Sequence, residues 1–168
     1  MNLKLIYPRW PKLQHQTEFH LPPHGPVCFA ATLPPDVQVT FVDENVDPLD
    51  FQDSPELVAM SVMLTCQIPR AWEIADAYRA RGIPVIFGGI ATMLHAEETK
   101  AHATSVFLGE AEGRMEQVLA DFRAGQLKPV YDFLRNPPDI RLVGPARRDI
   151  LNRPRYNFRG VQMVDLIH

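Results

Sequence analysis

A short apolar run that stops on two glycines constrains the fold of this chain more than any other feature. The sequence Val-Ile-Phe at residues 85–87 lies between Pro84 and the pair Gly88-Gly89. Such a run, bounded by turn residues, is typical of a central strand of a parallel sheet that helices cover on both faces. Ligands of these sheets bind beyond the carboxyl ends of the strands, where glycines leave room beside the backbone. Gly88 and Gly89 therefore shape a ligand site or simply make a tight turn, and two glycines alone favour the turn.

Similar runs recur along the chain and alternate with helical patterns. Apolar or alternating segments predict strands at residues 3–7, 37–43, 57–62, 85–87 and 105–108. Apolar residues at helical spacing predict helices at residues 25–33, 68–81, 96–103 and 114–123. Because such units join through right-handed crossovers, we expect an α/β, flavodoxin-like (Rossmann-like) fold. Its doubly wound sheet should hold five parallel strands in the order 2-1-3-4-5, followed by an irregular C-terminal extension.

Composition and charge narrow the class of protein. The chain has 168 residues, of which 46% are hydrophobic and 22% charged, as in an ordinary globular domain. Its net charge of -3, without a basic patch, gives no indication of nucleic-acid binding. No apolar run is long enough to span a membrane, and the N-terminus leads straight into a strand, so we expect a cytoplasmic protein. Cys28 and Cys66 lie too far apart in sequence to indicate a metal site or a disulfide framework.

The expected topology brings the ends of several strands to one edge of the sheet. The segments that follow these strands are residues 7–10, 61–67, 88–92 and 109–113. Ser61 and Thr65 offer hydroxyls that can hydrogen-bond a neutral ring or a backbone group. Glu110 and Glu112 either form an acid/base pair or favour the start of a helix, and we put the helix first. We find no nucleophile paired with a base, and no glycine-rich phosphate motif after the first strand.

Four segments together resemble a known domain. They are residues 42–50 (Val-Asp-Glu-Asn-Val-Asp-Pro-Leu-Asp), 61–65 (Ser-Val-Met-Leu-Thr), 88–92 (Gly-Gly-Ile-Ala-Thr) and 109–113 (Gly-Glu-Ala-Glu-Gly). Their order and spacing are similar to those of the cobalamin-binding domain that precedes the catalytic barrel in many radical S-adenosylmethionine (radical SAM) enzymes. Anaerobic magnesium-protoporphyrin IX monomethyl ester cyclase and various cobalamin-dependent methylases belong to this family. The resemblance covers roughly residues 1–150 and rests on the combination of segments, since each alone is weak.

The resemblance implies a cobalamin site at the carboxyl edge of the sheet. The residues that it assigns to this site, or that lie beside it, are Trp10, Ser61, Met63, Thr65, Gly88, Gly89, Thr92, Gly109, Glu110 and Gly113. The hydroxyls after the third strand look like those that flank the nucleotide tail of cobalamin, and the glycine pair looks like the surface on which the tail lies. Gly109, Glu110 and Gly113 resemble the far wall of that site. Trp10 and Met63 are either contacts to the corrin ring or residues that pack within loops.

The histidines depart from the patterns of related proteins. Residues 88–92 lack the histidine that many members carry in Gly-Gly-x-His-Ala-Thr. The Asp-x-His-x-x-Gly motif, which supplies a cobalt ligand in relatives of methionine synthase, is also absent, and His15, His20 and His24 do not have its spacing. We therefore expect base-off cobalamin, bound without a protein histidine on cobalt and open on one face for methyl transfer or radical chemistry. We expect no catalytic residue and no metal ligand in this chain.

The C-terminal part indicates a piece of a larger enzyme. Residues 128–168 are rich in proline and arginine and predict a linker, with a strand at residues 161–168. In the family, a Cys-x-x-x-Cys-x-x-Cys loop that binds a 4Fe-4S cluster follows at this point, and two cysteines cannot build it. We therefore expect a cobalamin-binding domain at residues 1–127, then a linker and the first strand of a missing barrel. S-adenosylmethionine and the cluster would belong only to the parent enzyme, whose barrel acts in cis.

Other classes of function use the same fold. A stand-alone carrier or sensor of cobalamin or another tetrapyrrole, without catalysis, remains open. A receiver domain is disfavoured, because Thr65 and residues 7–9 (Tyr-Pro-Arg) stand where its acidic residues would be, and residues 109–110 where its lysine would be. A flavodoxin is disfavoured because residues 8–11 (Pro-Arg-Trp-Pro) cannot form its phosphate loop. The substrate of a parent enzyme does not follow from these residues.

Overall fold

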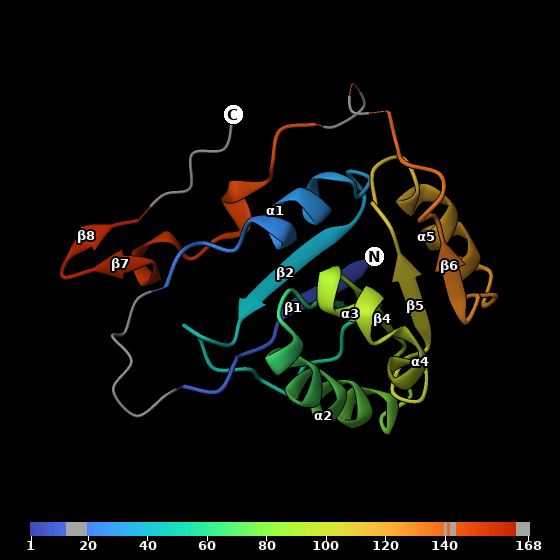
Figure 1. Cartoon of the computed structure of the whole chain (residues 1–168), viewed down its shortest axis with the longest axis horizontal. Helices are drawn as coiled ribbons and strands as arrows, with labels where there is room; N and C mark the ends of the chain where they lie inside the picture. Colours follow the sequence, from blue (N-terminus) through green and yellow to red (C-terminus); the bar gives the residue numbers. More distant parts are fainter. Residues whose placement is uncertain (13–19, 140, 142–143, 164–168) are drawn as a thin grey trace.

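Six parallel strands form one sheet in the order β2-β1-β3-β4-β5-β6 in the computed structural model of the chain (Figure 1). The structure describes residues 1–12, 20–139, 141 and 144–163. The strands are β1 (Asn2–Tyr7), β2 (Gln38–Asp43), β3 (Leu57–Ser61), β4 (Val85–Gly88), β5 (Ser105–Leu108) and β6 (Val130–Asp132). The α/β, flavodoxin-like fold and the order of the first five strands are confirmed. The count of five strands is wrong, because β6 pairs in parallel with β5.

The sixth strand comes from the segment that we expected to be irregular. β6 follows Pro129 and has only three residues, so it carries no periodicity that could have identified it. Tyr131 is buried in β6, and its ring lies 6.5 Å from that of Phe107 on β5. Its hydroxyl donates a hydrogen bond to Asp121 on the preceding helix, over 2.7 Å. The local sequence therefore does not indicate β6, whose Tyr131 makes its contacts in the tertiary structure.

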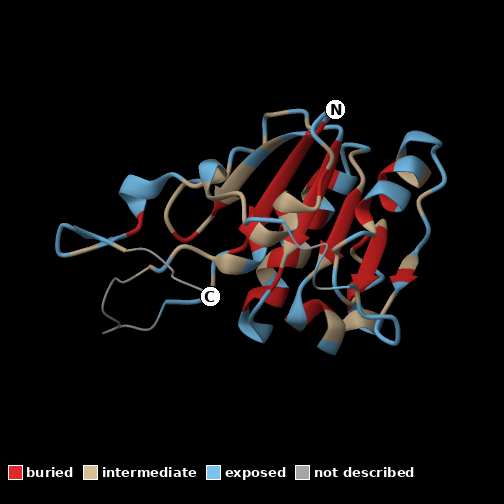
Figure 2. Ribbon diagram, turned by 90° about the horizontal axis from the view of Figure 1, so that it is seen from above, coloured by how far each residue is buried: buried red, intermediate tan, exposed pale blue. Residues whose placement is uncertain are grey.

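Helices cover both faces of the sheet. They are α1 (His24–Ala31), α2 (Ile68–Arg79), α3 (Ile90–Leu94), α4 (Ala96–Thr99) and α5 (Met115–Arg123). α1 and α5 pack on one face, and α2, α3 and α4 on the other (Figure 1). Alternate strand residues supply the two cores, so that Leu5 joins the first and Ile6 the second. The central strands are buried on both faces (Figure 2), as their unbroken apolar runs predict.

The helix between β4 and β5 differs from the expected one. We predicted a single helix at residues 96–103, but the structure has α3 and α4, separated at His95. α3 begins at Ile90, directly after the glycine pair. The chain therefore passes from the end of β4 into a helix within one residue, which places the first turn of α3 at the carboxyl edge of the sheet.

Beyond β6 the chain returns across the molecule to α1 and β2 (Figure 1). Single 3-10 turns at Arg148–Ile150 and Arg153–Arg155 lead to an antiparallel hairpin of β7 (Asn157–Phe158) and β8 (Val161–Gln162). Within the strand that we predicted at residues 161–168, the structure describes only β8 and Met163; residues 164–168 lie outside the described residues. No helix among the described residues has the length and apolar character needed to cross a bilayer.

Candidate functional site

The carboxyl ends of all six strands lie at the same edge of the sheet, as parallel pairing requires. We call this the carboxyl edge; it includes the segments that follow β1, β3, β4 and β5, at residues 8–10, 62–67, 89–92 and 109–113. Strand order reverses between β1 and β3, which is where doubly wound sheets bind ligands. Ser61 on β3 pairs in register with Gly88 on β4. The structure thus brings these two predicted site residues side by side.

The two glycines at the end of β4 have different roles. A Cβ at Gly88 would meet no atom within 4 Å, so the space beside this residue is open. Gly89 has a φ of 100°, and a Cβ there would lie 2.9 Å from the backbone nitrogen of Val62. This close approach is reinforced by Ala91, whose backbone N–H donates to the Val62 carbonyl over 3.1 Å. Gly89 is therefore required by the tight turn, whereas the space beside Gly88 is not filled by other parts of the described chain.

The loop after β3 is organised around Gln67, which is completely buried. The side-chain oxygen of Gln67 accepts the backbone N–H groups of Met63 and Leu64, at 3.1 and 2.9 Å. Its amide nitrogen donates to the Pro8 carbonyl after β1. The side chains of Met63 and Leu64 stay 56% and 39% exposed, and Thr65 is exposed beside them. Gln67 was not predicted from the sequence, because no local motif marks a buried amide that joins two loops.

Trp10 lies in the loop after β1 and is held there by its neighbours. Its backbone N–H donates to the side chain of Asn45 over 3.2 Å. Its ring meets that of Tyr7 edge-on, with centroids 6.2 Å apart, and lies 5.9 Å from the ring of His20. Burial, followed by the negative charge of Asp43, raises the pKa of Tyr7 to about 12, so its hydroxyl stays protonated at neutral pH. Trp10 thus packs within its loop while remaining partly exposed.

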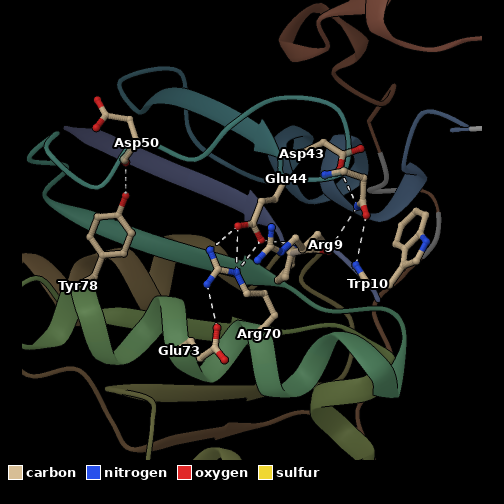
Figure 3. A network of polar contacts seen from close by, with 10 residues as sticks. Arg9, Trp10, Asp43, Glu44, Asp50, Arg70, Glu73 and Tyr78 are labelled. Atoms are coloured by element: carbon tan, nitrogen blue, oxygen red, sulfur yellow. Dashed lines mark hydrogen bonds and ion pairs between the residues drawn. The ribbon is translucent and has the colours of Figure 1, made fainter. Parts of the chain in front are cut away.

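An ion pair between Glu44 and Arg70 contacts this loop at the backbone of Arg9 (Figure 3). Arg70 Nε donates to both carboxylate oxygens of Glu44, at 3.0 and 3.1 Å, and the backbone N–H of Arg9 donates to one of them over 3.2 Å. Arg70 also bonds Glu73 on its own helix, over 2.9 Å. Burial is the largest single effect on Glu44 and opposes its ionisation, but the hydrogen bonds from Arg70 and Arg9, together with the charges of both arginines, outweigh burial and lower the pKa of this carboxyl. The pair joins the segment after β2 to α2.

Thr92 and Gly109 maintain the backbone conformation at the carboxyl edge. The hydroxyl of Thr92 is buried and donates to the Gly88 carbonyl over 3.0 Å, so Thr92 holds the turn rather than facing the open space. Gly109 has a φ of 105°, and a Cβ there would lie 3.0 Å from the carbonyl carbon of Phe133, in the chain after β6. The space beside Gly113 is open, at a φ of 69°. Gly109 and Gly113 follow β5, so they lie one strand further along the carboxyl edge than Gly88, which ends β4.

The two glutamates after β5 precede a helix, near whose start we expected them. α5 begins at Met115, and the acidic residue of its first turn is Glu116. Glu110 is exposed, and Glu112 is partly buried. Both lie near the thiol of Cys28 on α1, whose pKa is raised mainly by burial and then by these charges. Among the described residues, no hydrogen bond joins the carboxylates of Glu110 and Glu112 as an acid/base pair would require.

Five of the large exposed apolar residues come after strands that end at this edge. They are Met63 and Leu64 after β3, Ile90 and Leu94 on α3, and Leu134 after β6. The other large apolar residues exposed in the described part of the chain are Leu21 and Val161. Of these residues only Met63 was predicted from the sequence, although the helical spacing of Ile90 and Leu94 could have indicated one exposed face.

The described residues include no group of three or more His, Cys, Asp or Glu side chains that could hold a metal ion. His24 lies at the start of α1, and its Nε2 is 3.1 Å from the sulfur of Cys28. His20 packs near Trp10. His15 lies outside the described residues.

The chain is similar to two curated methyltransferases of Chlorobaculum tepidum. Bacteriochlorophyllide d C-8(2)-methyltransferase is 34% identical over 113 residues, which are 67% of this chain and 25% of that protein. Bacteriochlorophyllide d C-12(1)-methyltransferase is 31% identical over 119 residues, which are 69% of this chain and 26% of that protein. The matched part thus spans about a quarter of the length of each relative. No family model matches the chain, and no solved structure matches it significantly.

Proposed function

We propose that this chain is the cobalamin-binding part of a methyltransferase and holds base-off cobalamin at the carboxyl edge of its sheet. The observation that supports this most is the open space beside Gly88, next to Ser61 on β3 and close in sequence to the exposed side chain of Met63. A corrin with a nucleotide tail needs room against the backbone, a few hydrogen-bonding groups and an apolar surface. The residues of the carboxyl edge fit these needs.

The proposed roles follow the positions of the side chains. Ser61 and Thr65 would hydrogen-bond the nucleotide tail, and Gly88 would let the tail lie against β4. Gly89 and Thr92 would keep that turn in shape, as their contacts indicate. The remaining proposed contacts are the apolar surface of Trp10 and Met63, and a far wall of Gly109, Glu110 and Gly113. When bound, cobalamin would supply a cobalt atom that can carry a methyl group.

His20 and His24 are proposed to take no part in binding cobalt. The Nε2 of His24 is occupied by its contact with Cys28, and the ring of His20 packs near that of Trp10. Neither residue belongs to the segments that follow β3 and β4. A base-off spectrum without a histidine ligand is therefore the expected signature of the bound cofactor.

The relatives suggest what a longer parent protein would do. Both are methyltransferases that act, by name, on bacteriochlorophyllide d. Of the two reactions that the resemblance implied, methylation and ring closure, they favour methylation. We propose that the parent methylates a related tetrapyrrole in the cytoplasm. Its radical SAM barrel, reached in cis through residues 128–168, would hold S-adenosylmethionine and a 4Fe-4S cluster. Residues 1–127 would form the cobalamin-binding domain, to whose sheet residues 128–168 add β6.

Titration of the chain with hydroxocobalamin, followed by visible spectra at neutral and acidic pH, tests the proposal. We expect binding, with a base-off spectrum at both pH values. Gly88→Leu should weaken binding by about tenfold or more, because its side chain fills the open space. Gly144→Leu is the matched control, since Gly144 also lacks a left-handed φ and a Cβ there would likewise meet no atom within 4 Å. Failure of the wild-type chain to bind, or unchanged binding by Gly88→Leu, would contradict the proposal.

A further inference from the structure

Gln67 is a polar side chain with no exposed surface, and its hydrogen bonds reach two separate loops. Its oxygen accepts from Met63 and Leu64, and its nitrogen donates to Pro8. A buried amide is unfavourable unless such bonds are made, so both ends of the side chain matter. The Pro8 carbonyl has a second, longer donor in Asn45, at 3.4 Å. Loss of Gln67 should therefore loosen the loops without unfolding the sheet.

The two loops follow β1 and β3, the neighbouring strands between which the strand order reverses. One loop carries Trp10, and the other carries Met63 and Leu64. Because Gln67 turns the backbone N–H groups of the second loop inward, the side chains of Met63 and Leu64 remain exposed. The hydroxyl of Tyr7 lies 3.9 Å from the sulfur of Met63, which is a further contact between the two segments.

We infer that Gln67 is a positioning residue of the carboxyl edge, which fixes the loops after β1 and β3 relative to each other and so presents Met63 and Leu64 to a flat, largely apolar macrocycle. This inference rests on the proposed function for the identity of the ligand. Gln67 itself is buried, so it acts through the loops and does not touch the ligand. The arrangement requires both an acceptor and a donor at position 67, which the neutral amide of glutamine supplies whatever the pH.

Three variants of the full chain separate these requirements. Gln67→Met keeps the size of the side chain but removes all three hydrogen bonds. Gln67→Glu keeps the acceptor for Met63 and Leu64 and loses the donor to Pro8 once its carboxyl is ionised, so this variant is measured at a pH high enough to ionise a buried carboxyl. Gln117→Met is the matched control, because Gln117 is an exposed residue of α5.

Two readouts keep the inference distinct from the proposed function. The first is the affinity for hydroxocobalamin, with the visible spectrum of the bound form. The second is the rate at which iodoacetamide alkylates Cys66 in the absence of cobalamin. Cys66 is exposed and directly precedes Gln67, whereas Cys28 is partly buried. Alkylation of Cys66, located by mass spectrometry, therefore reports on the order of the loop after β3.

We expect Gln67→Met to keep its circular dichroism spectrum, to bind hydroxocobalamin about tenfold more weakly, and to be alkylated faster at Cys66. Gln67→Glu should show both effects, and Gln117→Met neither. A folded Gln67 variant with wild-type affinity and a wild-type alkylation rate would overturn the inference; if Gln67→Met does not fold, Gln67→Glu decides. If the wild-type chain binds no cobalamin, the proposed function fails, and the inferred ligand with it, while the alkylation rates still decide whether Gln67 orders the loop.

Discussion

The hydroxyl of Tyr156 donates a hydrogen bond to the carboxylate of Asp43 over 3.2 Å, although 113 positions separate the two residues. Tyr156 is 1% exposed, while most residues around it in the extension are exposed. Asp43 also accepts from the backbone and the side chain of Asn45, at 2.9 and 2.8 Å. Since Asn45 in turn binds the backbone of Trp10, the C-terminal extension is connected to the loop after β1. The extension is therefore anchored at the carboxyl end of β2 rather than being a free linker.

Removal of the Tyr156 hydroxyl should loosen this anchor. Tyr156→Phe keeps the packing of the ring but takes one donor from a buried carboxylate, which should lower the free energy of unfolding by about 1–2 kcal/mol. Tyr156→Ala also removes the ring and should cost about 3–5 kcal/mol. Urea denaturation measures both values. Gln162→Ala, on the exposed strand β8, is the control, and a Tyr156→Phe variant as stable as this control would contradict the anchor.

The stability contributed by Asp43 should depend on pH in the opposite sense from that of a paired surface carboxylate. Burial raises the pKa of Asp43 above 3.8, although bonds from Asn45 and Tyr156 lower it in part. The folded state therefore binds this proton more tightly than the unfolded state, and stability is lost as pH rises from 3.8 to the folded pKa. Asp43→Asn should thus gain stability relative to the wild type as pH rises through this window. Thermal unfolding between pH 3 and pH 7 tests the direction, and a relative loss over that range would refute it.

The neighbouring Glu44 should show the reverse dependence. Its lowered pKa means that the pair with Arg70 stabilises the fold above pH 4.5, and that this stability is lost as pH falls through the folded pKa. Glu44→Gln should cost about 1–3 kcal/mol at pH 7, and less in acid. Glu73→Gln is the matched control, because Glu73 bonds the same Arg70 but its side chain is 65% exposed; it should cost less than about 1 kcal/mol. Equal costs for the two variants would show that burial of Glu44 does not matter.

The fold could be predicted because its signals are local. The apolar run before Gly88, and similar runs in β1, β3 and β5, mark buried strands, and the helical spacing of apolar residues marks α2 and α5. The order of the first five strands follows from general rules of handedness and connection. Short elements such as β6 and α3 were missed or misplaced, since three to five residues carry too little periodicity.

The location of the candidate site was predictable from topology, but its internal support was not. Ser61 and Gly88 lie together because their strands end in register, which follows once the strand order is known. Gln67 and Tyr156 form their key contacts with residues 59 and 113 positions away. A buried polar side chain has no periodic signature, because its role depends on partners that only the tertiary structure supplies. The sequence therefore predicts the carboxyl edge of the sheet, but not the contacts of Gln67 and Tyr156 that support it.

The two glycines after β4 should respond differently to the same substitution. Gly89→Ala places a Cβ against the backbone of Val62 at a φ of 100°, and should cost about 1–3 kcal/mol or more. Gly88→Ala meets open space and has no left-handed φ, so it should be neutral or stabilise by up to about 1 kcal/mol. Melting temperatures of the two variants measure the difference. Similar losses at both positions would mean that Gly88 is also required by the turn, and would remove the argument that it leaves room for a ligand.

Electrostatic contacts should hold the extension in place together with Tyr156. Residues 128–168 carry eight Lys or Arg and four Asp or Glu, whereas the whole chain is negative. Asp47, in the segment after β2, accepts from Arg155 over 2.8 Å and from Asn152 over 3.1 Å. Asp47→Asn should therefore expose the bond after Arg155 and speed its cleavage by trypsin at low salt.

Asp139→Asn is the control for this experiment, because Asp139 pairs only two positions away, with Arg141, and so does not join the extension to the sheet. High salt should speed cleavage of the wild type, and of Asp47→Asn less, since salt screens exposed ion pairs. If trypsin cuts after Arg155 at the same rate in the wild type and in Asp47→Asn at low salt, the charges of Asp47 and Arg155 contribute nothing to docking. The anchor would then rest on contacts other than this ion pair, among them the buried hydrogen bond between Tyr156 and Asp43.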